Sequence, residues 1–276
     1  MGCCERQGKL TSLKDRLQID RTKVENDIIH FIRNTIAETK AKGVVLGLSG
    51  GIDSSVVVTI CARALEGSKV LGLLMPSEFT PDEDTSDARE LAENLGIQTH
   101  LIPMSQIVDK LLETIPLKTK SELTVGNIFA RMRMIMNYSF ANSMNFLVAG
   151  TGDRSELMIG YFTKYGDGGT DFMPIAHLYK TQVKQLAKHL GLPSEMVDKP
   201  SSPQLWKGQK ATDEIPIDYP ILDQVLCGLF DANMSVKDIA EQLNIESEII
   251  ITVQKRFEDS RHKRTAPRML TPPKLD

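Results

Sequence analysis

The sequence predicts an α/β fold in which helices flank an open parallel sheet and a helical part follows at the C-terminal end. Short apolar runs at 44–48, 69–75 and 146–150 have the length and composition of buried strands. Stretches with helical periodicity separate these runs, as the crossovers of a parallel sheet require. From residue 219 onward the periodicity is helical only. Ligands of such folds bind at the carboxyl ends of the strands, so the loops there are the candidate sites.

The N-terminal half alternates helices with strands. Residues 1–18 are polar and are expected to be flexible. Each later periodic or apolar stretch is bounded by turn-forming residues. The predicted elements are a helix at 19–40, a strand at 44–48, a helix at 55–65, a strand at 69–75, a helix at 84–96, a strand at 98–103, a helix at 104–115, a long helix at 124–144 and a strand at 146–150.

The C-terminal half is predicted to be helical apart from one long loop. Residues 199–218 contain three prolines and many polar side chains, which predicts a mobile loop that could cover a site. The predicted helices begin near residue 178 and continue at 219–230, 235–243 and 246–257, and a basic run at 256–268 follows. The helix at 246–257 carries acidic residues, so it is a poor candidate for reading the major groove of DNA.

Composition and charge limit the class of protein. The 276 residues are 41% hydrophobic and 25% charged, with a net charge of -3, which is typical of a single globular domain spanning 1–276 and not of a nucleic-acid-binding protein. No apolar run is long enough for a membrane span and no signal peptide is recognisable, so we expect no membrane partner and a cytoplasmic location. The cysteines lack metal-ligand spacing and are expected to be reduced thiols; they are Cys3, Cys4, Cys61 and Cys227.

Residues 47–55, with the sequence GLSGGIDSS, join the first predicted strand to the next helix. A glycine turn there directs backbone N–H groups and the positive end of a helix dipole at one point, which favours phosphate. Asp53 would repel phosphate unless a divalent cation lies between them, so the loop also predicts Mg²⁺. The spacing matches neither the common P-loop nor the dinucleotide fingerprint. A tight connection without a ligand is the alternative.

Further polar residues are expected near the same edge of the sheet. Glu156 follows small and hydroxylic residues after the strand at 146–150, so it and Asp53 could share a metal. Lys180 lies in the first turn of a helix, where the dipole disfavours a cation, so we expect an anion beside it. The segment 160–169 combines glycines and aromatic residues, which suits a ligand with a flat group; a solvated hairpin is the alternative.

Several motifs together carry a resemblance to a known family. The loop SGGIDS at 49–54 resembles the pyrophosphate-binding loop of the ATP pyrophosphatase superfamily, which cleaves ATP between its α- and β-phosphates. Four further segments resemble NAD synthetases in order and spacing: NIFARMRM at 127–134, GTGDRSE at 150–156, FTKYGDG at 162–168 and LYKTQV at 178–183, followed by HKR at 262–264. The resemblance covers about residues 20–268 and implies a Rossmann-like fold of the adenine-nucleotide alpha-hydrolase type.

The resemblance assigns roles to individual residues. For ATP it implies Gly47, Leu48, Ser49, Gly50, Gly51, Ile52, Asp53, Ser54, Ser55, Met75, Thr151, Lys180 and Ser201. For deamido-NAD it implies Arg131, Tyr138, Lys164, Asp167, His262 and Lys263. Asp53 and Glu156 are the implied metal ligands, with Mg²⁺ as the cofactor. Asp153 stands where related chains often have asparagine, and Ser201 where a threonine is common.

The implied reaction is the ATP-dependent amidation of deamido-NAD with ammonia through an adenylated carboxylate, giving NAD, AMP and pyrophosphate. Glutamine-dependent relatives carry a long N-terminal amidase domain, and fewer than about fifty residues precede the loop here, so free ammonia is the expected donor. The family also implies a homodimer. The alternatives are another ATP-pyrophosphatase amidotransferase or thiolase acting on XMP or tRNA, and a nucleotide-sensing module without catalysis, which would not need both acids.

Overall fold

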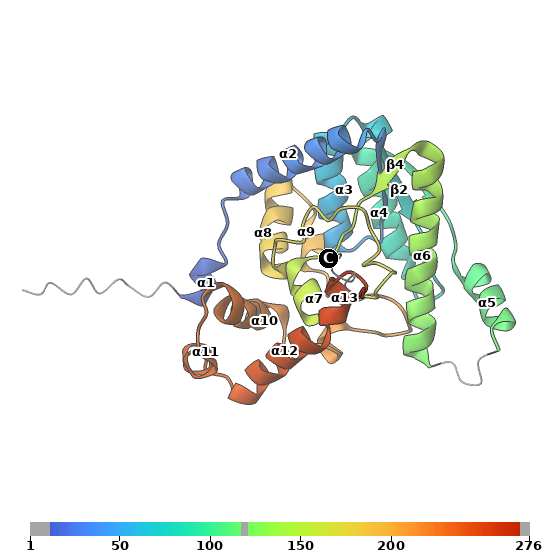
Figure 1. Cartoon of the computed structure of the whole chain (residues 1–276). Coiled ribbons are helices and arrows are strands. Elements are labelled where there is room, and N and C mark those ends of the chain that lie inside the picture. The colour runs from blue at the N-terminus through green and yellow to red at the C-terminus, as the bar shows by residue number, and fades with distance from the viewer. Residues whose placement is uncertain (1–11, 117–120, 271–276) are drawn as a thin grey trace, which may run out of the picture.

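The computed structural model describes residues 12–116 and 121–270 and contains a parallel sheet covered by helices on both faces (Figure 1). Its strand order is β3-β2-β1-β4. The strands are β1 (Gly43–Gly47), β2 (Val70–Leu74), β3 (Gln98–Leu101) and β4 (Phe146–Val148). All three pairings are parallel, so the carboxyl ends meet at one edge. The α/β fold with an open parallel sheet is therefore confirmed.

Alternation along β1 divides the core into two faces. Val44 and Leu46 pack into one cluster of buried residues, whereas Val45 between them packs into another. Neighbouring residues of a strand point to opposite faces, so a strand buried on both sides is apolar throughout. Helices α2 (Arg21–Thr39), α3 (Ile52–Ala64), α4 (Asp82–Asn94) and α8 (Lys180–Leu190) supply the first cluster, and α5 (Ser105–Thr114) and α6 (Glu122–Met144) supply the second.

A third cluster of buried residues lies away from the sheet, among the C-terminal helices at the lower left of Figure 1. It is built from α7 (Arg154–Ile159), α10 (Tyr219–Leu226), α11 (Val236–Leu243) and α12 (Ser247–Asp259). The predicted helix at 219–230 differs from the structure, because π-helical turns over Cys227–Asp231 follow α10. The remaining helical turns are Gly67–Lys69, α9 (Ser194–Asp198), Ala211–Asp213 and α13 (Arg261–Arg264).

The start of the described chain differs from the expected flexible terminus. Residues 13–16 form the short helix α1 (Leu13–Arg16), whose first turn is capped by Ser12, with Asp15 N–H donating to Ser12 Oγ at 3.1 Å. Leu13 and Leu17 are buried in the C-terminal cluster. Two leucines four residues apart lie on one side of a helical turn, so a short segment can be anchored by tertiary packing alone. Residues 1–11, with Cys3 and Cys4, lie outside the described residues.

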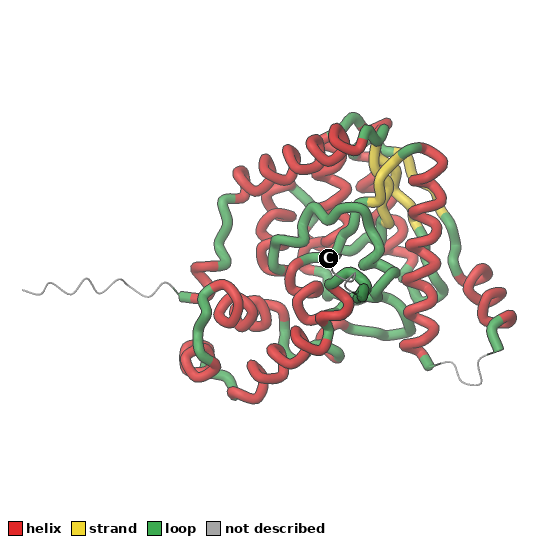
Figure 2. The backbone as a smooth tube through the Cα atoms, viewed as in Figure 1, coloured by secondary structure: helices red, strands yellow, loops and turns green. Residues whose placement is uncertain are grey.

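The segment 199–218 is mostly irregular, as its prolines predict (green in Figure 2). Lys199 pairs with Asp84 and, at 3.3 Å, with Asp87 at the start of α4, and Gln204 donates to Asp84. These contacts tie the segment to the helix beside the glycine loop. Its mobility stays a prediction. Among the described residues, no helix combines the length and the apolar character that crossing a membrane demands.

Candidate active site

The glycine loop connects β1 to α3 at the carboxyl edge of the sheet, and its own hydroxyl groups hold it in shape. Ser49 N–H donates to Ser54 Oγ at 3.2 Å, and Gly51 N–H donates to Ser49 Oγ at 3.3 Å. The hydroxyl groups of Ser54 and Ser55 both donate to the carbonyl of Gly51, at 3.0 and 2.9 Å. Ser49 and Ser54 line the cavity described next, but Ser55 is buried away from it. The loop is thus a preformed turn that ends at a helix N-terminus.

Gly50 is required by both its backbone angle and its surroundings. Its φ of +76° is in the left-handed region, and a Cβ would collide with the carbonyl oxygen of Asp84. We expect Gly50→Ala to lower the free energy of unfolding by about 2 kcal/mol or more. Gly96→Ala is the matched control, because Gly96 also has positive φ but would meet no atom within 4 Å. Urea unfolding measures the free energy of unfolding of both variants. An equal decrease in the two would contradict a steric collision at residue 50.

A cavity of about 310 Å³ opens at this edge of the sheet. The glycine loop, the end of β2, one face of α6 and the segment 199–205 surround it. This volume is typical of a site for a small molecule. Of the residues predicted to bind ATP or metal, the cavity is lined by Gly47, Leu48, Ser49, Gly51, Ile52, Asp53, Ser54, Met75, Thr151, Glu156 and Ser201, whereas Gly50, Ser55 and Lys180 do not line it.

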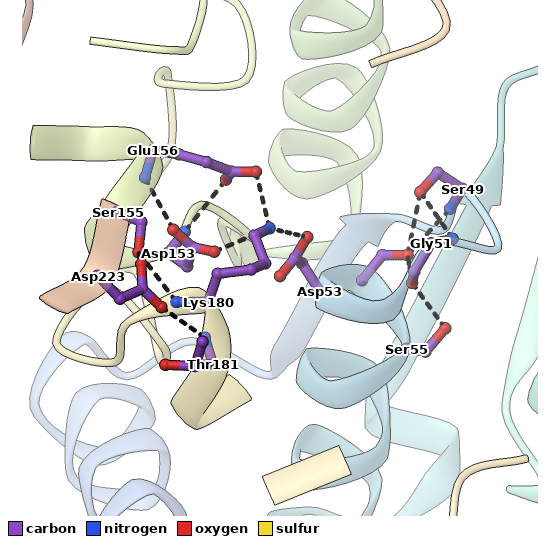
Figure 3. A network of polar contacts seen from close by, with 11 residues as sticks. Ser49, Gly51, Asp53, Ser55, Asp153, Ser155, Glu156, Lys180, Thr181 and Asp223 are labelled. Atoms are coloured by element: carbon purple, nitrogen blue, oxygen red, sulfur yellow. Dashed lines mark hydrogen bonds and ion pairs between the residues drawn. The ribbon is translucent and has the colours of Figure 1, made fainter. Parts of the chain in front are cut away.

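Lys180 lies beside the cavity, where its ammonium group is surrounded by three carboxylates (Figure 3). Its Nζ is 2.6 Å from Asp53 Oδ2, 2.8 Å from Asp153 Oδ2 and 2.8 Å from Glu156 Oε1. The Lys180 and Asp153 side chains are fully buried, and those of Asp53 and Glu156 are about one-fifth exposed. The anions that the sequence predicts beside Lys180 therefore include carboxylates of the chain itself. Asp153 was noted in the sequence only for replacing an asparagine of related chains, and its place beside Lys180 was not predicted.

The charges of this cluster do not balance. Burial raises the pKa of Glu156 to about 7, and the charge of Asp53 adds to this, while Lys180 opposes it. Burial also raises the pKa of Asp153, with a contribution from Glu156. The pKa of Lys180 is well above its ordinary value because the three carboxylates outweigh its burial. One ammonium group faces three acids, and the raised pKa values of Glu156 and Asp153 show that these two acids retain protons more readily than usual. A bound cation would take the place of those protons and stabilise the charged carboxylates.

The same carboxylates fit a magnesium ion. One oxygen from each of Asp53, Asp153 and Glu156 can be chosen so that all three lie within 4.8 Å of one another. The buried Oδ1 of Asp53 has no hydrogen-bond partner, so it is free to act as a ligand. Carboxylate oxygens are the protein ligands that Mg²⁺ prefers. Lys180 lies among these oxygens and would compete with an ion for them.

Comparison with known proteins identifies the family. The family model described as NAD synthase matches residues 24–267. The chain belongs to the NAD synthase family. It is 45% identical over 257 residues to the NH(3)-dependent NAD(+) synthetase of Hyperthermus butylicus, covering 93% of each protein. It is 42% identical over 257 residues to that of Staphylothermus marinus, covering 93% of this chain and 94% of the relative.

Solved structures place the same fold in this family. The NH3-dependent NAD synthetase from Campylobacter jejuni matches with a TM-score of 0.78 and 31% identity, over 92% of this chain and all of the other. NMN synthetase from Francisella tularensis matches with a TM-score of 0.80 and 30% identity, over 92% and 99% of the two chains. The resemblance that the motifs carry is therefore confirmed.

The residues predicted to bind the dinucleotide lie mostly outside the cavity. Arg131 Nε–H donates to the carbonyl of Lys164 at 3.3 Å, and Lys164 Nζ donates to that of His262 at 2.5 Å. Lys263 Nζ donates to the carbonyls of Gly160 and Phe162, at 2.7 and 2.8 Å. These contacts hold the basic side chains of Arg131 and Lys263 against backbone carbonyls of the glycine-rich segment. The C-terminal basic run thus folds back onto the chain.

The other two predicted dinucleotide residues are placed differently. Asp167 lines the cavity and accepts from Thr163 N–H at 2.8 Å. The hydroxyl of Tyr138 donates to Asp171 Oδ1 at 3.0 Å. Tyr138 therefore has a different partner from Lys164, which bonds to His262. Its place in a dinucleotide site stays a prediction.

Arg133 lines the cavity, although no role was predicted for it from the sequence. Its Nε–H donates to the carbonyl of Met75 at 3.1 Å, and the residue lines the cavity. Burial lowers the pKa of its guanidinium to about 10, so the group stays charged at neutral pH. A positive group in the cavity wall suits an anionic ligand. Helical periodicity alone could not say which arginine of α6 turns toward the sheet edge.

Proposed function

We propose that this protein joins ammonia to the carboxylate of deamido-NAD (nicotinic acid adenine dinucleotide) in a reaction that converts ATP to AMP and pyrophosphate. The observation that supports this most strongly is that the glycine loop, Lys180 and two cavity-lining acids lie together at one edge of the sheet. The chain also belongs to the NAD synthase family. The homologues favour this function over an XMP or tRNA substrate, since their names specify NH(3)-dependent NAD(+) synthetase.

The chemistry proceeds in two steps. An oxygen of the substrate carboxylate attacks the α-phosphorus of ATP, the bond to the bridging oxygen breaks, and pyrophosphate departs with the electron pair. The lone pair of ammonia then attacks the acyl carbon of the mixed anhydride, AMP departs, and the nitrogen loses a proton to solvent. Neither step needs a nucleophilic side chain. The protein must instead stabilise the charge that develops on pyrophosphate.

The residues of the glycine loop and Lys180 are suited to this task. Ser49, Gly51 and Ser54 of the loop line the cavity, and their hydrogen bonds within the loop would have to be exchanged for bonds to phosphate oxygens when the nucleotide binds. Lys180 lies beside the cavity and would contribute positive charge near the nucleotide phosphates, and Thr151 and Ser201 line the cavity itself. Asp53 and Glu156 would hold Mg²⁺, which neutralises phosphate charge when bound. Arg131, Lys164, Asp167, His262 and Lys263, with Tyr138, are proposed to contact deamido-NAD.

A homodimer is proposed from family membership, with deamido-NAD near the subunit boundary. Leu123 and Ile135 on α6 are 61% and 46% exposed, and Phe31 on α2 is 45% exposed. These side chains are candidates for burial between two copies. A cytoplasmic location likewise stays a prediction.

The decisive experiment incubates the protein with ATP, Mg²⁺, ammonium and deamido-NAD and measures the products. We expect NAD, AMP and pyrophosphate in equal amounts. ADP as the nucleotide product would refute adenylation. Nicotinic acid mononucleotide, XMP and glutamine serve as comparison substrates: faster turnover of either nucleotide would change the substrate assignment, and glutamine hydrolysis would contradict free ammonia as the donor.

A further inference from the structure

Asp223 is a fully buried carboxylate on α10 that does not line the cavity. It accepts hydrogen bonds from Ser155 Oγ–H at 2.6 Å and from Thr181 N–H at 2.7 Å. Ser155 Oγ in turn accepts from the backbone N–H of Lys180 at 2.9 Å. Figure 3 shows these groups on the side of Lys180 away from the glycine loop. A buried carboxylate is costly unless its oxygens are satisfied, so contacts this close indicate a specific task.

These hydrogen bonds join the first turns of two helices. Ser155 belongs to the first turn of α7, between Asp153 and Glu156, and Lys180 and Thr181 begin α8. The first N–H groups of a helix have no partner within the helix. In α8 the first two, those of Lys180 and Thr181, donate to Ser155 Oγ and Asp223 Oδ2. One carboxylate therefore fixes the relative position of the helices that carry Lys180 and two of its three acids.

Tyr219 lies one turn before Asp223 on α10 and supports the same lysine. Its ring centroid is 5.2 Å from Lys180 Nζ, a favourable arrangement for an ammonium group. Tyr219 also lines the cavity, and its buried hydroxyl has no hydrogen-bond partner. Helix α10 thus supports Lys180 in two ways. The ring of Tyr219 contacts its ammonium group, and Asp223 holds Ser155, whose hydroxyl accepts from the backbone N–H of Lys180.

We propose that Asp223 is a positioning residue that holds Lys180 in place for the nucleotide. It fixes the first turn of α8 against that of α7, which sets the distance between the Lys180 ammonium group and the carboxylates of Asp153 and Glu156. The proposal rests on the proposed function in one respect, namely that Lys180 acts on ATP. It also connects the C-terminal helical part to the active site, because α10 packs into the C-terminal cluster.

The test compares Asp223→Asn, Asp223→Ala and Ser155→Ala with a control from the same helix. Leu222→Ala is the control, because Leu222 is fully buried in α10 but is not part of the hydrogen-bonded group. For each variant, kcat and the KM values for ATP and deamido-NAD are measured, together with the rise in unfolding temperature that ATP and Mg²⁺ produce. The temperature shift needs no turnover.

We expect Asp223→Ala to reduce kcat/KM for ATP by about a hundredfold and Asp223→Asn or Ser155→Ala by about tenfold, with KM for deamido-NAD nearly unchanged. The double variant Ser155→Ala with Asp223→Ala should be no worse than Asp223→Ala, because both residues act through one connection. Leu222→Ala should lower the unfolding temperature yet keep the wild-type KM for ATP.

Two results would overturn the positioning role. One is an unchanged KM and an unchanged ATP-induced temperature shift in Asp223→Ala; the other is an equal loss of ATP affinity in Leu222→Ala, which would mean that stability alone is responsible. If the wild-type protein produced no NAD, the proposed function would fail by itself. The temperature shifts would still decide whether Asp223 supports nucleotide binding.

Discussion

Replacing Asp53 by asparagine is expected to reduce kcat by about a hundredfold to a thousandfold while leaving the fold intact. The side chain lines the cavity, one buried oxygen has no partner, and the other is 2.6 Å from Lys180 Nζ. Asparagine keeps an oxygen for Lys180 but removes the charge that a magnesium ion needs. Steady-state formation of AMP and NAD measures the effect, and full activity would refute the metal assignment.

The unfolding temperature of Asp53→Asn should not fall with its activity. The charge of Asp53 contributes to the raised pKa values of Glu156 and Asp153, so it repels both. Removing that repulsion offsets the weaker interaction of Lys180 with an uncharged partner, so the unfolding temperature should stay close to that of the wild type. A lower temperature would show that the carboxylate is needed for folding, and the activity loss could not then be assigned to chemistry alone.

Asp153→Asn is the matched control, because it removes a carboxyl group from the same cluster at a position outside the cavity lining. Asp153 is fully buried, does not line the cavity, and caps α7 by accepting from Glu156 N–H at 2.8 Å. Asparagine caps a helix about as well as aspartate, so we expect an activity loss of about tenfold at most. If the two variants lost activity equally, the charge of the cluster and not the cavity position of Asp53 would be responsible.

The fold could be predicted from the sequence wherever several consecutive residues are buried, because such a segment is apolar throughout. The apolar runs of β1 and β2 mark strands covered on both faces, and parallel pairing follows from the helices between them. The edge strand β3 is a weaker signal, since Leu101 is 48% exposed. The anchoring of α1 was not predictable, because it depends on a pocket made by helices far along the chain.

The candidate site was predictable in part for a related reason. Asp53 and Glu156 follow strands that end at one edge, so topology alone brings them together. The Asp53–Lys180 contact joins residues 127 positions apart, and the bonds of Asp223 reach 42 and 68 positions. No local pattern encodes such distances. Asp153 was missed because a carboxylate just before a helix is ordinarily read as a cap, which it also is.

Replacing Lys180 by methionine is expected to abolish most activity and to destabilise the protein in a pH-dependent manner. The substitution keeps the length of the side chain but leaves three acids without their cation. Breaking a buried ion pair in this way costs about 3–5 kcal/mol. Lys110→Met is the control, because Lys110 is 79% exposed and pairs only with Glu113 at the surface; it should change stability little at any pH.

The direction of the pH dependence follows from the raised carboxyl pKa values. Glu156 has a folded-state pKa of about 7 against an ordinary value of 4.5, and Lys180 holds it down, so its pKa should rise further in Lys180→Met. The folded variant then binds protons that the unfolded chain does not, and this stabilisation is lost as pH rises through the folded pKa. We therefore expect a larger loss of stability at pH values of about 8 than about 6, measured by urea unfolding.

Mg²⁺ should stabilise Lys180→Met more than the wild type, because the carboxylate oxygens that Lys180 contacts become available to the ion. Equal losses at both pH values, with no added effect of Mg²⁺, would contradict the competition between lysine and metal.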